Sequence, residues 1–354
     1  MGISVERFGL NAHGGSVEKY TLTNKSGASV SLLTYGGVIQ AICVPDKNGR
    51  LSDVCLGFDN METYLAPNGS MGAFIGRYGN RIDYARFTLD GHEYRLRANM
   101  GESHLHGGPL GFQTYTMQAE AREDNGIDHV KMSMYSPDGD ECYPGSLDVS
   151  VIYSFDDNMN LSIRYEAHTD SVTILNLTNH CYFNLAGQDF GPIDNHLITI
   201  PADCVTRINE RVVPTGDFFP VAGTPLDLRH PKRMGDGLKE GEGCQQMVLG
   251  SGYDHNYVLN KAFGMGLCAV VEEPVTGRVM EVITDQPGLQ FYSGNHMNLK
   301  GKGKGGADYL WRNAFCLETQ RFPDSPNHLH FPSTVLRKGE LFTSVTIYAF
   351  RTRG

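Results

Sequence analysis

The chain has 354 residues and a formal net charge of −10. An acidic surface repels nucleic-acid phosphates, so the charge disfavours a nucleic-acid partner. Hydrophobic residues make up 40% of the chain, which is enough for a packed core and excludes a largely disordered protein. Glycine occurs 42 times, well above the average usage of about 7%. This excess indicates many tight turns and therefore many strands.

Membrane and secretory signals are missing from the sequence. No run approaches the ~18 consecutive apolar residues of a membrane-spanning helix. The first residues, MGISVERFGLNAHGG, lack the basic and apolar regions of a signal peptide. The eight cysteines form no CxxC pair and do not resemble a disulfide framework. We therefore expect reduced thiols in a cytoplasmic protein without a membrane partner.

Short β-favouring runs follow one another along the chain. The sequence predicts strands within 17–24, 28–35, 37–44, 146–155, 159–168, 171–183 and 341–352, and hairpins within 86–96 and 271–285. Asp90-Gly91 is a strong hairpin signal between two alternating segments, and Thr276-Gly277 marks the second turn. Only residues 62–67 suggest a helix, of one or two turns.

This order of elements indicates the fold class. Strands that do not alternate with helices argue against a parallel doubly wound sheet. The sequence has no repeat of fixed period and no linker rich in proline or serine. We predict an all-β protein, a large single-domain antiparallel β-sandwich over residues 1–354. The interior of a sandwich is filled, so function is expected in loops and on a concave sheet face.

Two ionisable residues stand beside apolar strand residues. His180 lies inside TNHCYFNLAG (178–187), and Glu318 follows the apolar run 314–317. Ionisable groups in such places must be exposed or paired, because burying them unpaired is costly. From this feature alone, a surface glutamate and a hydrogen-bonded core histidine are the more common outcome.

Other polar motifs are ambiguous on their own. His104 and His106 alternate on a possible strand, so both side chains could serve one site, but a zinc site needs a third ligand. GRYGNRI (76–82) suits either a loop that presents donors to an oxygen-rich ligand or a plain turn. In GYDHNYVL (252–259), Asp254 and its neighbours suit the capping of backbone groups in a turn. Gln290, beside Phe291 and Tyr292, combines amide and aromatic groups, which suits sugars as well as core packing. GKGKGG (301–306) matches GxGxxG literally without the required β-helix-β context, so a mobile lysine loop is expected there.

Together, these segments resemble one family, aldose 1-epimerase, also called galactose mutarotase. The resemblance runs from about residue 15 to the C-terminus. It rests on motifs in the family's order: GGVIQAICVPDKNGRLSDVCLGFD (36–59), GRYGNRI, HLHGG (104–108), TNHCYFNLAG, GYDHNYVL, PGLQFYSGN (287–295) and LETQRFPDSPN (317–327).

The resemblance implies a β-sandwich with a sugar in an open cleft and no metal or organic cofactor. It places the proton-transfer residues at Glu318 and His180. It places the substrate contacts at Asn80, Arg81, His106, Asp254 and Gln290. Two positions depart from the usual pattern, Gly79 in place of alanine and Cys181 in place of serine, and both remain small.

The implied reaction exchanges the α and β anomers of a free aldohexose by opening and reclosing the ring. We predict that Glu318 is the base at the C1 hydroxyl and His180 the imidazolium acid at the ring oxygen, because a nearby carboxylate favours a charged histidine. His106 is expected to stabilise charge on the sugar oxygens, with Arg81 as a fixed donor. The expected partner is a small aldose sugar, in hexose and galactose metabolism, and either a monomer or a dimer is open.

Three alternatives remain at this point. A hexose-6-phosphate epimerase would need extra cations, for which Arg77 and the lysines of 301–306 are the candidates. A non-catalytic sugar-binding protein of the same fold would not require an acid–base pair. A zinc hydrolase would use His104 and His106.

Overall fold

Three antiparallel sheets make up most of the computed structural model, which describes residues 2–124 and 126–353. The first sheet has the order β1-β2-β3-β4-β5, with bounds Gly2–Leu10, Ser16–Thr23, Ser29–Leu33, Ile39–Pro45 and Leu51–Asp53. The second has nine strands in the order β11-β12-β13-β14-β27-β23-β22-β17-β20, with bounds Gln118–Asp124, Ile127–Ser136, Leu147–Phe155, Asn160–Thr169, Phe342–Thr352, Arg278–Thr284, Gly266–Glu273, Leu197–Thr199 and Lys232–Arg233. The third has the order β19-β18-β21-β24-β25, with bounds Pro214–Pro220, Ala202–Ile208, Asp254–Leu259, Gly288–Tyr292 and Cys316–Gln320.

Short elements connect these sheets. Four two-stranded ladders pair β7 (Arg81–Ile82) with β10 (His104–Leu105), β6 (Phe74–Ile75) with β16 (Thr178–Asn179), β8 (Arg86–Leu89) with β9 (His92–Arg95), and β15 (Thr173–Ile174) with β26 (Val335–Leu336). The helices are α1 (Met61–Leu65), α2 (Met234–Glu240) and α3 (Gln245–Leu249), and six 3₁₀ turns are η1 (Asp83–Ala85), η2 (Phe112–Thr114), η3 (Asp140–Cys142), η4 (Gly241–Gly243), η5 (Lys304–Gly306) and η6 (Ser325–Asn327).

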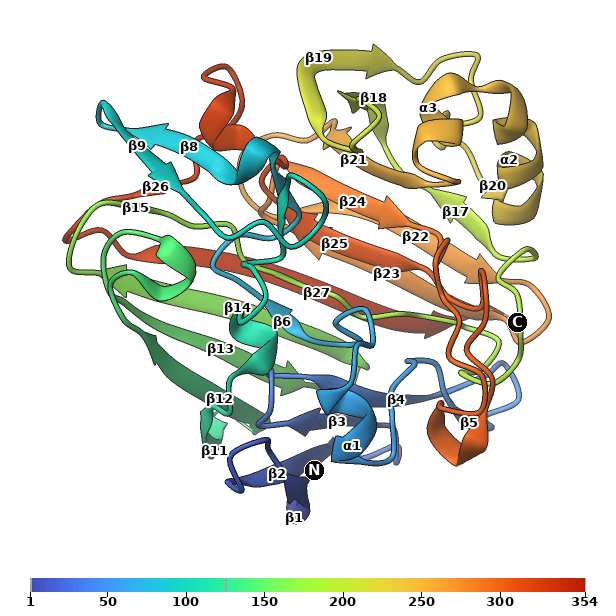
Figure 1. Cartoon of the computed structure of the whole chain (residues 1–354). Coiled ribbons are helices and arrows are strands. Elements are labelled where there is room, and N and C mark those ends of the chain that lie inside the picture. Colours follow the sequence, from blue (N-terminus) through green and yellow to red (C-terminus); the bar gives the residue numbers. More distant parts are fainter. Residues whose placement is uncertain (1, 125, 354) are drawn as a thin grey trace.

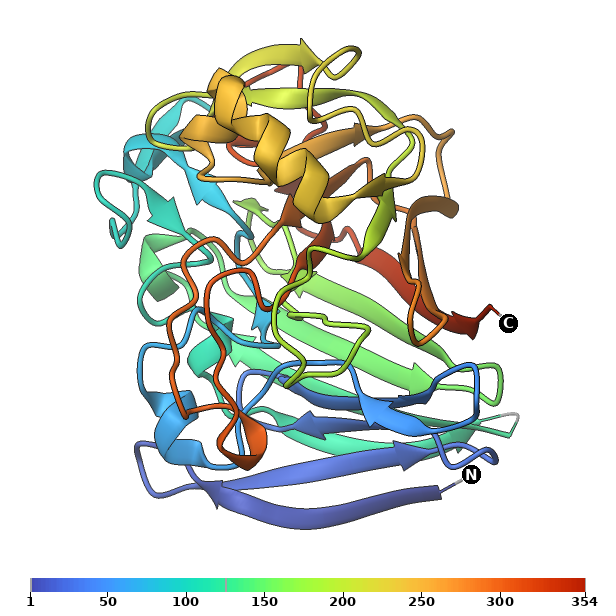
Figure 2. The same ribbon diagram turned by 90° about the vertical axis from the view of Figure 1, so that its right-hand side faces the viewer.

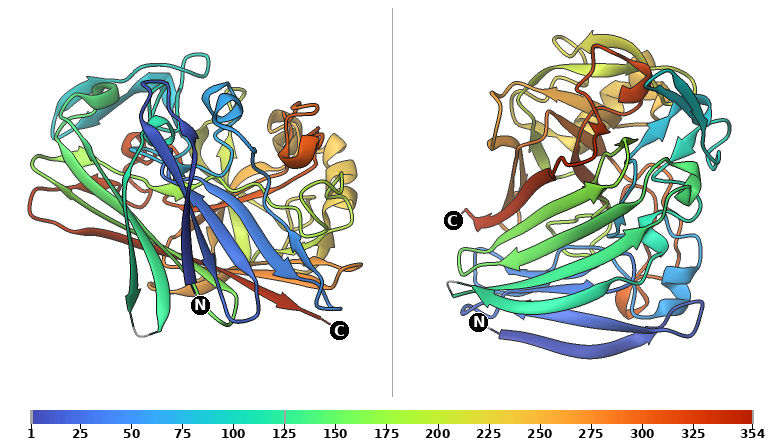
Figure 3. Two further views of the ribbon diagram at one scale, coloured as in Figure 1. Left: turned by 90° about the horizontal axis from the view of Figure 1, so that it is seen from below. Right: turned by 90° about the vertical axis from the view of Figure 1, so that its left-hand side faces the viewer.

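The nine-stranded sheet is the central layer of the molecule. Figure 1 shows β1–β5 at one end of this sheet and the third sheet, with α2 and α3, at the other. The side views in Figures 2 and 3 show the long curved strands of the central sheet passing between these two ends. One apolar core joins Val30 of the first sheet, Val151 and Val282 of the central sheet, and Phe291 of the third. The predicted all-β antiparallel sandwich is confirmed.

Most predicted strands are present within one or two residues of their expected bounds. The hairpin within 86–96 turns at Asp90 and Gly91, whose φ angles of 48° and 81° match the two positive φ values that the tightest hairpin turns require. The hairpin within 271–285 forms β22 and β23, with Gly277 at φ 72°. The helix expected at 62–67 is α1, capped by the Asn60 side chain.

The strand predicted over 171–183 is wrong. Only β15 and β16 form there, because the backbone of this run changes partner along its length: β15 pairs with β26, Asn176 N–H donates to the Arg77 carbonyl at 2.9 Å, and β16 pairs with β6. The Asn176 side chain bonds to both the N–H and the carbonyl of Arg321, and Asn179 Oδ1 accepts from the N–H of Cys181. Helices α2 and α3 were not predicted, since glycines interrupt the apolar period of α2 and α3 has only five residues. Among the described residues, none of the helices has the length and apolar character needed to cross a membrane.

Candidate active site

The third sheet presents polar side chains on the face that turns away from the central layer. Leu289 and Phe291 of β24 point into the core, so Gln290 between them points the other way. In the register, Gln290 lies opposite Glu318 of β25 on one side and Asn256 of β21 on the other. Gln290 Nε2 donates to Asp254 Oδ1 at 2.6 Å, so three neighbouring strands contribute to one polar surface.

The ladder of β7 and β10 brings two further predicted residues together. Leu105 pairs with Arg81, and the backbone N–H of His106 then donates to the carbonyl of Asn80 at 3.0 Å. Asn80 and His106 adopt positive φ angles of 61° and 53°. The backbone N–H of Asn80 donates to His106 Nδ1 at 3.2 Å, so the backbone at Asn80 fixes the orientation of the imidazole. Arg81 Nη2 reaches Asp254 Oδ2 at 3.8 Å and links this loop to the third sheet.

His180 comes from the ladder of β6 and β16. It directly follows β16, and its N–H donates to the carbonyl of Ala73 at 2.9 Å. Tyr182 stacks on its ring at 4.9 Å between centroids with an interplanar angle of 13°. His106 meets it edge-on at 5.0 Å. The imidazole is therefore held from the backbone and from two sides.

These elements enclose a cleft of about 250 Å³. His180 Nε2 lies 3.8 Å from Glu318 Oε1, which is too long for a hydrogen bond and leaves both atoms available to a ligand. Glu318 is only 2% exposed and His180 6%. Among the described residues, buried polar atoms at or beside the cleft without a hydrogen-bond partner include Arg81 Nε, His180 Nδ1, Gln290 Oε1 and Glu318 Oε2. Buried polar groups without partners are costly, so a ligand rich in hydroxyl groups fits this cleft.

Burial also decides the protonation of the acid–base pair. It raises the pKa of Glu318 well above its ordinary value, helped by the nearby Asp254 and opposed by Arg81. Burial lowers the pKa of His180 to about 4, although Asp254 works in the other direction. Both shifts oppose the expected imidazolium in the free protein, since desolvation outweighs the attraction of nearby carboxylates. Burial thus favours the neutral form of each group.

Comparisons with known proteins identify the family. The family described as aldose 1-epimerase matches residues 18–349. Galactose mutarotase of Bos taurus is 42% identical over 336 residues, covering 95% of this chain and 94% of that protein. Aldose 1-epimerase of Escherichia coli (strain K12) is 34% identical over 333 residues, covering 93% and 94%. The chain belongs to the aldose 1-epimerase family.

Solved structures agree with this membership of the aldose 1-epimerase family. The crystal structure of galactose 1-epimerase from Lactobacillus acidophilus superposes with a TM-score of 0.87 at 26% identity and covers 100% of both chains. An aldose epimerase homologue from C. elegans gives a TM-score of 0.84 at 29% identity, covering 94% of this chain and 98% of that one. The resemblance of the sequence motifs to this family is thus confirmed.

All seven residues expected from the epimerase resemblance gather at one place. Asn80, Arg81, His106, His180, Asp254 and Glu318 line the cleft. Gln290 lies at the edge of this group and orients Asp254 through its hydrogen bond. The alternatives of a surface glutamate and of a hydrogen-bonded core histidine are both wrong here: Glu318 and His180 are buried and face the cleft.

Other residues considered in the sequence have structural roles. His104 does not share the site of His106, because the positive φ at His106 breaks the strand alternation. The ring nitrogens of His104 instead contact the Arg97 carbonyl at 2.6 Å and the Tyr143 hydroxyl at 2.7 Å. Arg77 is 1% exposed, and its guanidinium donates to five oxygens of Ser136, Pro137, Pro144 and Gly145.

The expectation of a mobile lysine loop at 301–306 is also wrong. Lys304 is buried, and its ammonium donates to the carbonyls of Gln40 and Cys55 at 2.7 Å and to Asp53 Oδ2 at 2.5 Å. This three-oxygen site anchors η5 to the first sheet.

Several cleft residues were missed. Tyr182 and Tyr292 line the cleft, and each stands two positions after a predicted residue, His180 and Gln290. Strand alternation was therefore a signal that could have found both. The loop residues Ser70, Asn99, Met100 and His296 carry no comparable local signal.

One candidate metal trio coincides with the cleft. His106, His180 and Glu318 bring one ligand atom each within 4.8 Å of one another. However, Asn80 N–H donates to His106 Nδ1, which places the ring proton of a neutral His106 on Nε2. Burial together with His180 and Arg81 lowers the His106 pKa well below its ordinary value, so the neutral form is expected. His106 is thus arranged as a hydrogen-bond donor to an oxygen, and metal binding through Nε2 would require the other tautomer.

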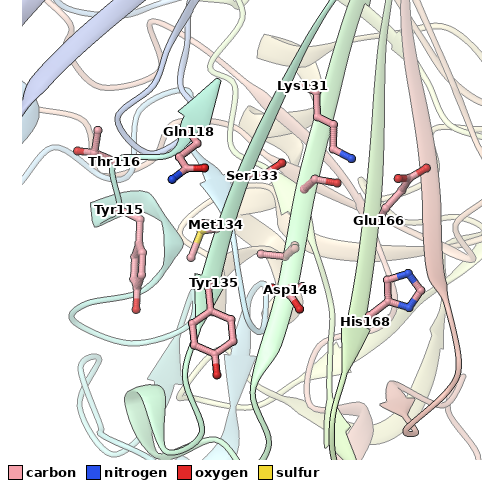
Figure 4. Close-up of a pocket in the computed structure, with 12 residues that line it drawn as sticks. Tyr115, Thr116, Gln118, Lys131, Ser133, Met134, Tyr135, Asp148, Glu166 and His168 are labelled. Atoms are coloured by element: carbon pink, nitrogen blue, oxygen red, sulfur yellow. The ribbon is translucent and has the colours of Figure 1, made fainter. Parts of the chain in front are cut away.

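A larger hollow lies elsewhere. It measures about 520 Å³ and follows the outer face of β12–β14, where Figure 4 shows Tyr135, Asp148, Glu166 and His168 on neighbouring strands. The register places Tyr135, Asp148 and His168 in one row across the sheet. None of the seven predicted residues lines this hollow, so size does not identify the candidate active site.

Proposed function

We propose that this chain interconverts the α and β anomers of free aldohexoses through an acid–base pair, with Glu318 as the base and His180 as the acid. The chain is an isomerase of the aldose 1-epimerase class, and its substrate is an aldose sugar. The observation that supports the two roles is the 3.8 Å separation of His180 Nε2 and Glu318 Oε1 in a buried cleft with unpartnered polar atoms.

The chemistry requires two groups placed close together. The C1 hydroxyl loses a proton while the ring oxygen gains one, and both oxygens are attached to the same carbon. Glu318 takes the hydroxyl proton, the C1–O5 bond breaks, and His180 protonates O5. Rotation about C1–C2 presents the other face of the aldehyde, and the two transfers reverse during closure. Each positioned proton transfer contributes about 10²–10⁴ in rate, or about 3–5 kcal/mol.

The sugar must relocate the proton of the pair. In the free protein burial raises the pKa of Glu318 and favours its protonated form, whereas the base role needs a carboxylate. Hydroxyl groups of the sugar, together with Arg81, supply donors to the carboxylate, and donors stabilise its charged form. The imidazolium on His180 then forms beside that carboxylate, so binding creates an ion pair from a neutral pair without any change in proton number.

Three alternatives are weaker for stated reasons. A hexose-6-phosphate epimerase would need free cations at the cleft, but Arg77 and Lys304 are saturated by internal oxygens, and Lys302 does not line the cleft. A non-catalytic sugar-binding protein would gain nothing from an acid and a base held within 4 Å of each other. The zinc-hydrolase hypothesis is weaker because Nδ1 of His106 accepts a hydrogen bond, which leaves Nε2 as a proton donor and not as a metal ligand.

The setting of the enzyme is part of the proposal. We place it in the cytoplasm, where thiols stay reduced, in agreement with its eight free cysteines. A single domain over residues 1–354, a role in hexose and galactose metabolism and the absence of nucleic-acid or membrane partners stay predictions. A monomer and a dimer are equally compatible with the described chain.

Polarimetry tests the proposal directly. Freshly dissolved α-D-glucose or α-D-galactose changes its optical rotation as the anomers equilibrate, and the protein should accelerate this change. Acceleration that disappears in Glu318→Gln supports the assignment, and the ratio between the two sugars reports the preferred hexose. A wild-type protein without effect on either sugar contradicts it.

A further inference from the structure

A second groove lies beside the long excursion between β24 and β25. Residues 293–315, drawn in orange to red below these two strands in Figure 1, carry His296 in the active cleft and η5 at their far end. The groove measures about 810 Å³ and lies between this excursion and residues 188–192. None of the seven predicted site residues lines it.

Aromatic groups stand exposed on both sides of the groove. Trp311 is 56% exposed and Phe190 65%. Arg312, which does not line the groove, stacks on the indole with its Cζ 3.9 Å from the ring centroid. This cation–π contact holds the indole in place, so little side-chain entropy is lost when a ligand packs against it. Exposed apolar surface with a polar rim marks a binding site more often than a random surface does.

Polar groups in the same groove have unused hydrogen-bonding capacity. Asp308 uses Oδ1 to accept from Gly301 N–H at 2.6 Å, which leaves Oδ2 available. Asn313 is buried; its Oδ1 accepts from Leu310 N–H at 2.5 Å, while no acceptor within the described chain pairs with its Nδ2. Asp189 lines the groove as an exposed carboxylate.

The charges of the groove select a neutral ligand over a phosphorylated one. The Lys304 ammonium is held by three internal oxygens, and Arg312, which stacks on the indole, does not line the groove. Two carboxylates that do line it, Asp189 and Asp308, repel phosphate. Carboxylates and an amide accept from and donate to hydroxyl groups, and an indole face packs against the C–H face of a pyranose ring.

We infer that this groove is an accessory binding site for a neutral pyranose sugar, distinct from the catalytic cleft. A closed-ring glycoside suits it as well as a free aldose, because the groove contains no acid–base pair. The inference does not depend on the proposed catalytic roles, since it rests on other residues.

Trp311 is the only tryptophan of the chain, so the tryptophan emission comes from a side chain that lines this groove. Methyl β-D-galactopyranoside and methyl α-D-glucopyranoside are suitable probes, because a methyl glycoside cannot undergo ring opening. We expect a saturable blue shift of the tryptophan emission as the sugar displaces water from the indole. The shift should persist in Arg81→Ala, which removes a donor from the catalytic cleft.

Asp189→Ala should raise the dissociation constant from this titration by about tenfold, the value of one hydrogen bond to a charged group. Phe263→Ala removes an exposed aromatic ring outside the groove and should leave the dissociation constant unchanged. Wild type and Asp189→Ala should show the same polarimetric rate, which separates this site from catalysis. The inference is overturned by an emission that does not respond to either glycoside, by a response that Arg81→Ala removes, or by one that Asp189→Ala leaves unaltered.

Discussion

Replacement of Glu318 by glutamine tests the site most sharply, because it removes the acid–base function and keeps the shape. Glu318 is 2% exposed and lies 3.8 Å from His180, so glutamine, which has nearly the same size, fills the same space without a carboxylate. Loss of one positioned proton transfer lowers kcat by about 10²–10⁴, or about 3–5 kcal/mol of transition-state stabilisation. Sugar binding should persist, since Arg81, His106 and Asp254 remain.

The same substitution should not lower the stability of the folded protein, although it lowers the rate. Because burial raises the pKa of Glu318, the folded protein holds this proton more tightly than the unfolded chain does. Above the ordinary carboxyl pKa, folding must therefore take up a proton, and this cost grows as the pH rises. Glutamine has no such cost. Glu318→Gln should accordingly unfold at the same or a higher temperature than wild type at neutral pH.

Polarimetry and thermal unfolding together give the decisive readout. The matched control is Glu62→Gln, which makes the same chemical change at an exposed residue of α1 and should alter neither rate nor melting temperature. Normal mutarotation by Glu318→Gln would refute its role as the base. A loss of rate accompanied by a clear drop in melting temperature would refute the account of its burial.

Three further predictions follow from the same geometry. His180→Asn should lower kcat by about 10²–10⁴, and the double variant with Glu318→Gln should be little slower than either single variant, because the two groups act as a unit. The pH profile of kcat/KM should have its acid limb near 4, below the ordinary histidine pKa of 6.5, because burial lowers the pKa of His180. Its alkaline limb should be set by the raised pKa of Glu318. A rate that halves near pH 6.5 would contradict the burial of His180. Arg77→Met should destabilise the protein by at least about 3 kcal/mol in urea unfolding, since five oxygens lose their donor, while KM for the sugar stays unchanged in the folded fraction.

The sequence was most informative where local patterns decide the structure. The turn at Asp90-Gly91 depends only on adjacent residues that tolerate positive φ, and it forms as predicted. The run 171–183 failed because its backbone pairs in turn with residues 335–336, Arg77 and residues 74–75, and no local pattern reveals such distant partners.

The site shows the same division. The residue types at Glu318 and His180 were predictable from the motifs of the family, whereas their burial and separation depend on strands that meet only in the fold. Gln290 and Glu318 pair across neighbouring strands although residues 293–315 intervene. Lys304 seemed a solvated loop lysine, because its acceptors in residues 40–55 lie in another sheet.

The burial of the acid–base pair links its electrostatics to its specificity. A low-dielectric cleft disfavours both the Glu318 carboxylate and the His180 imidazolium, so the neutral forms are favoured in the free protein. The proposed reaction needs the charged forms. A ligand that offers hydroxyl donors at O1 and an acceptor at O5 lowers the energy of the ion pair, whereas a ligand without both leaves the neutral pair favoured. Under the proposed roles, the choice of a substrate with a hemiacetal centre and the activation of Glu318 and His180 are therefore one event.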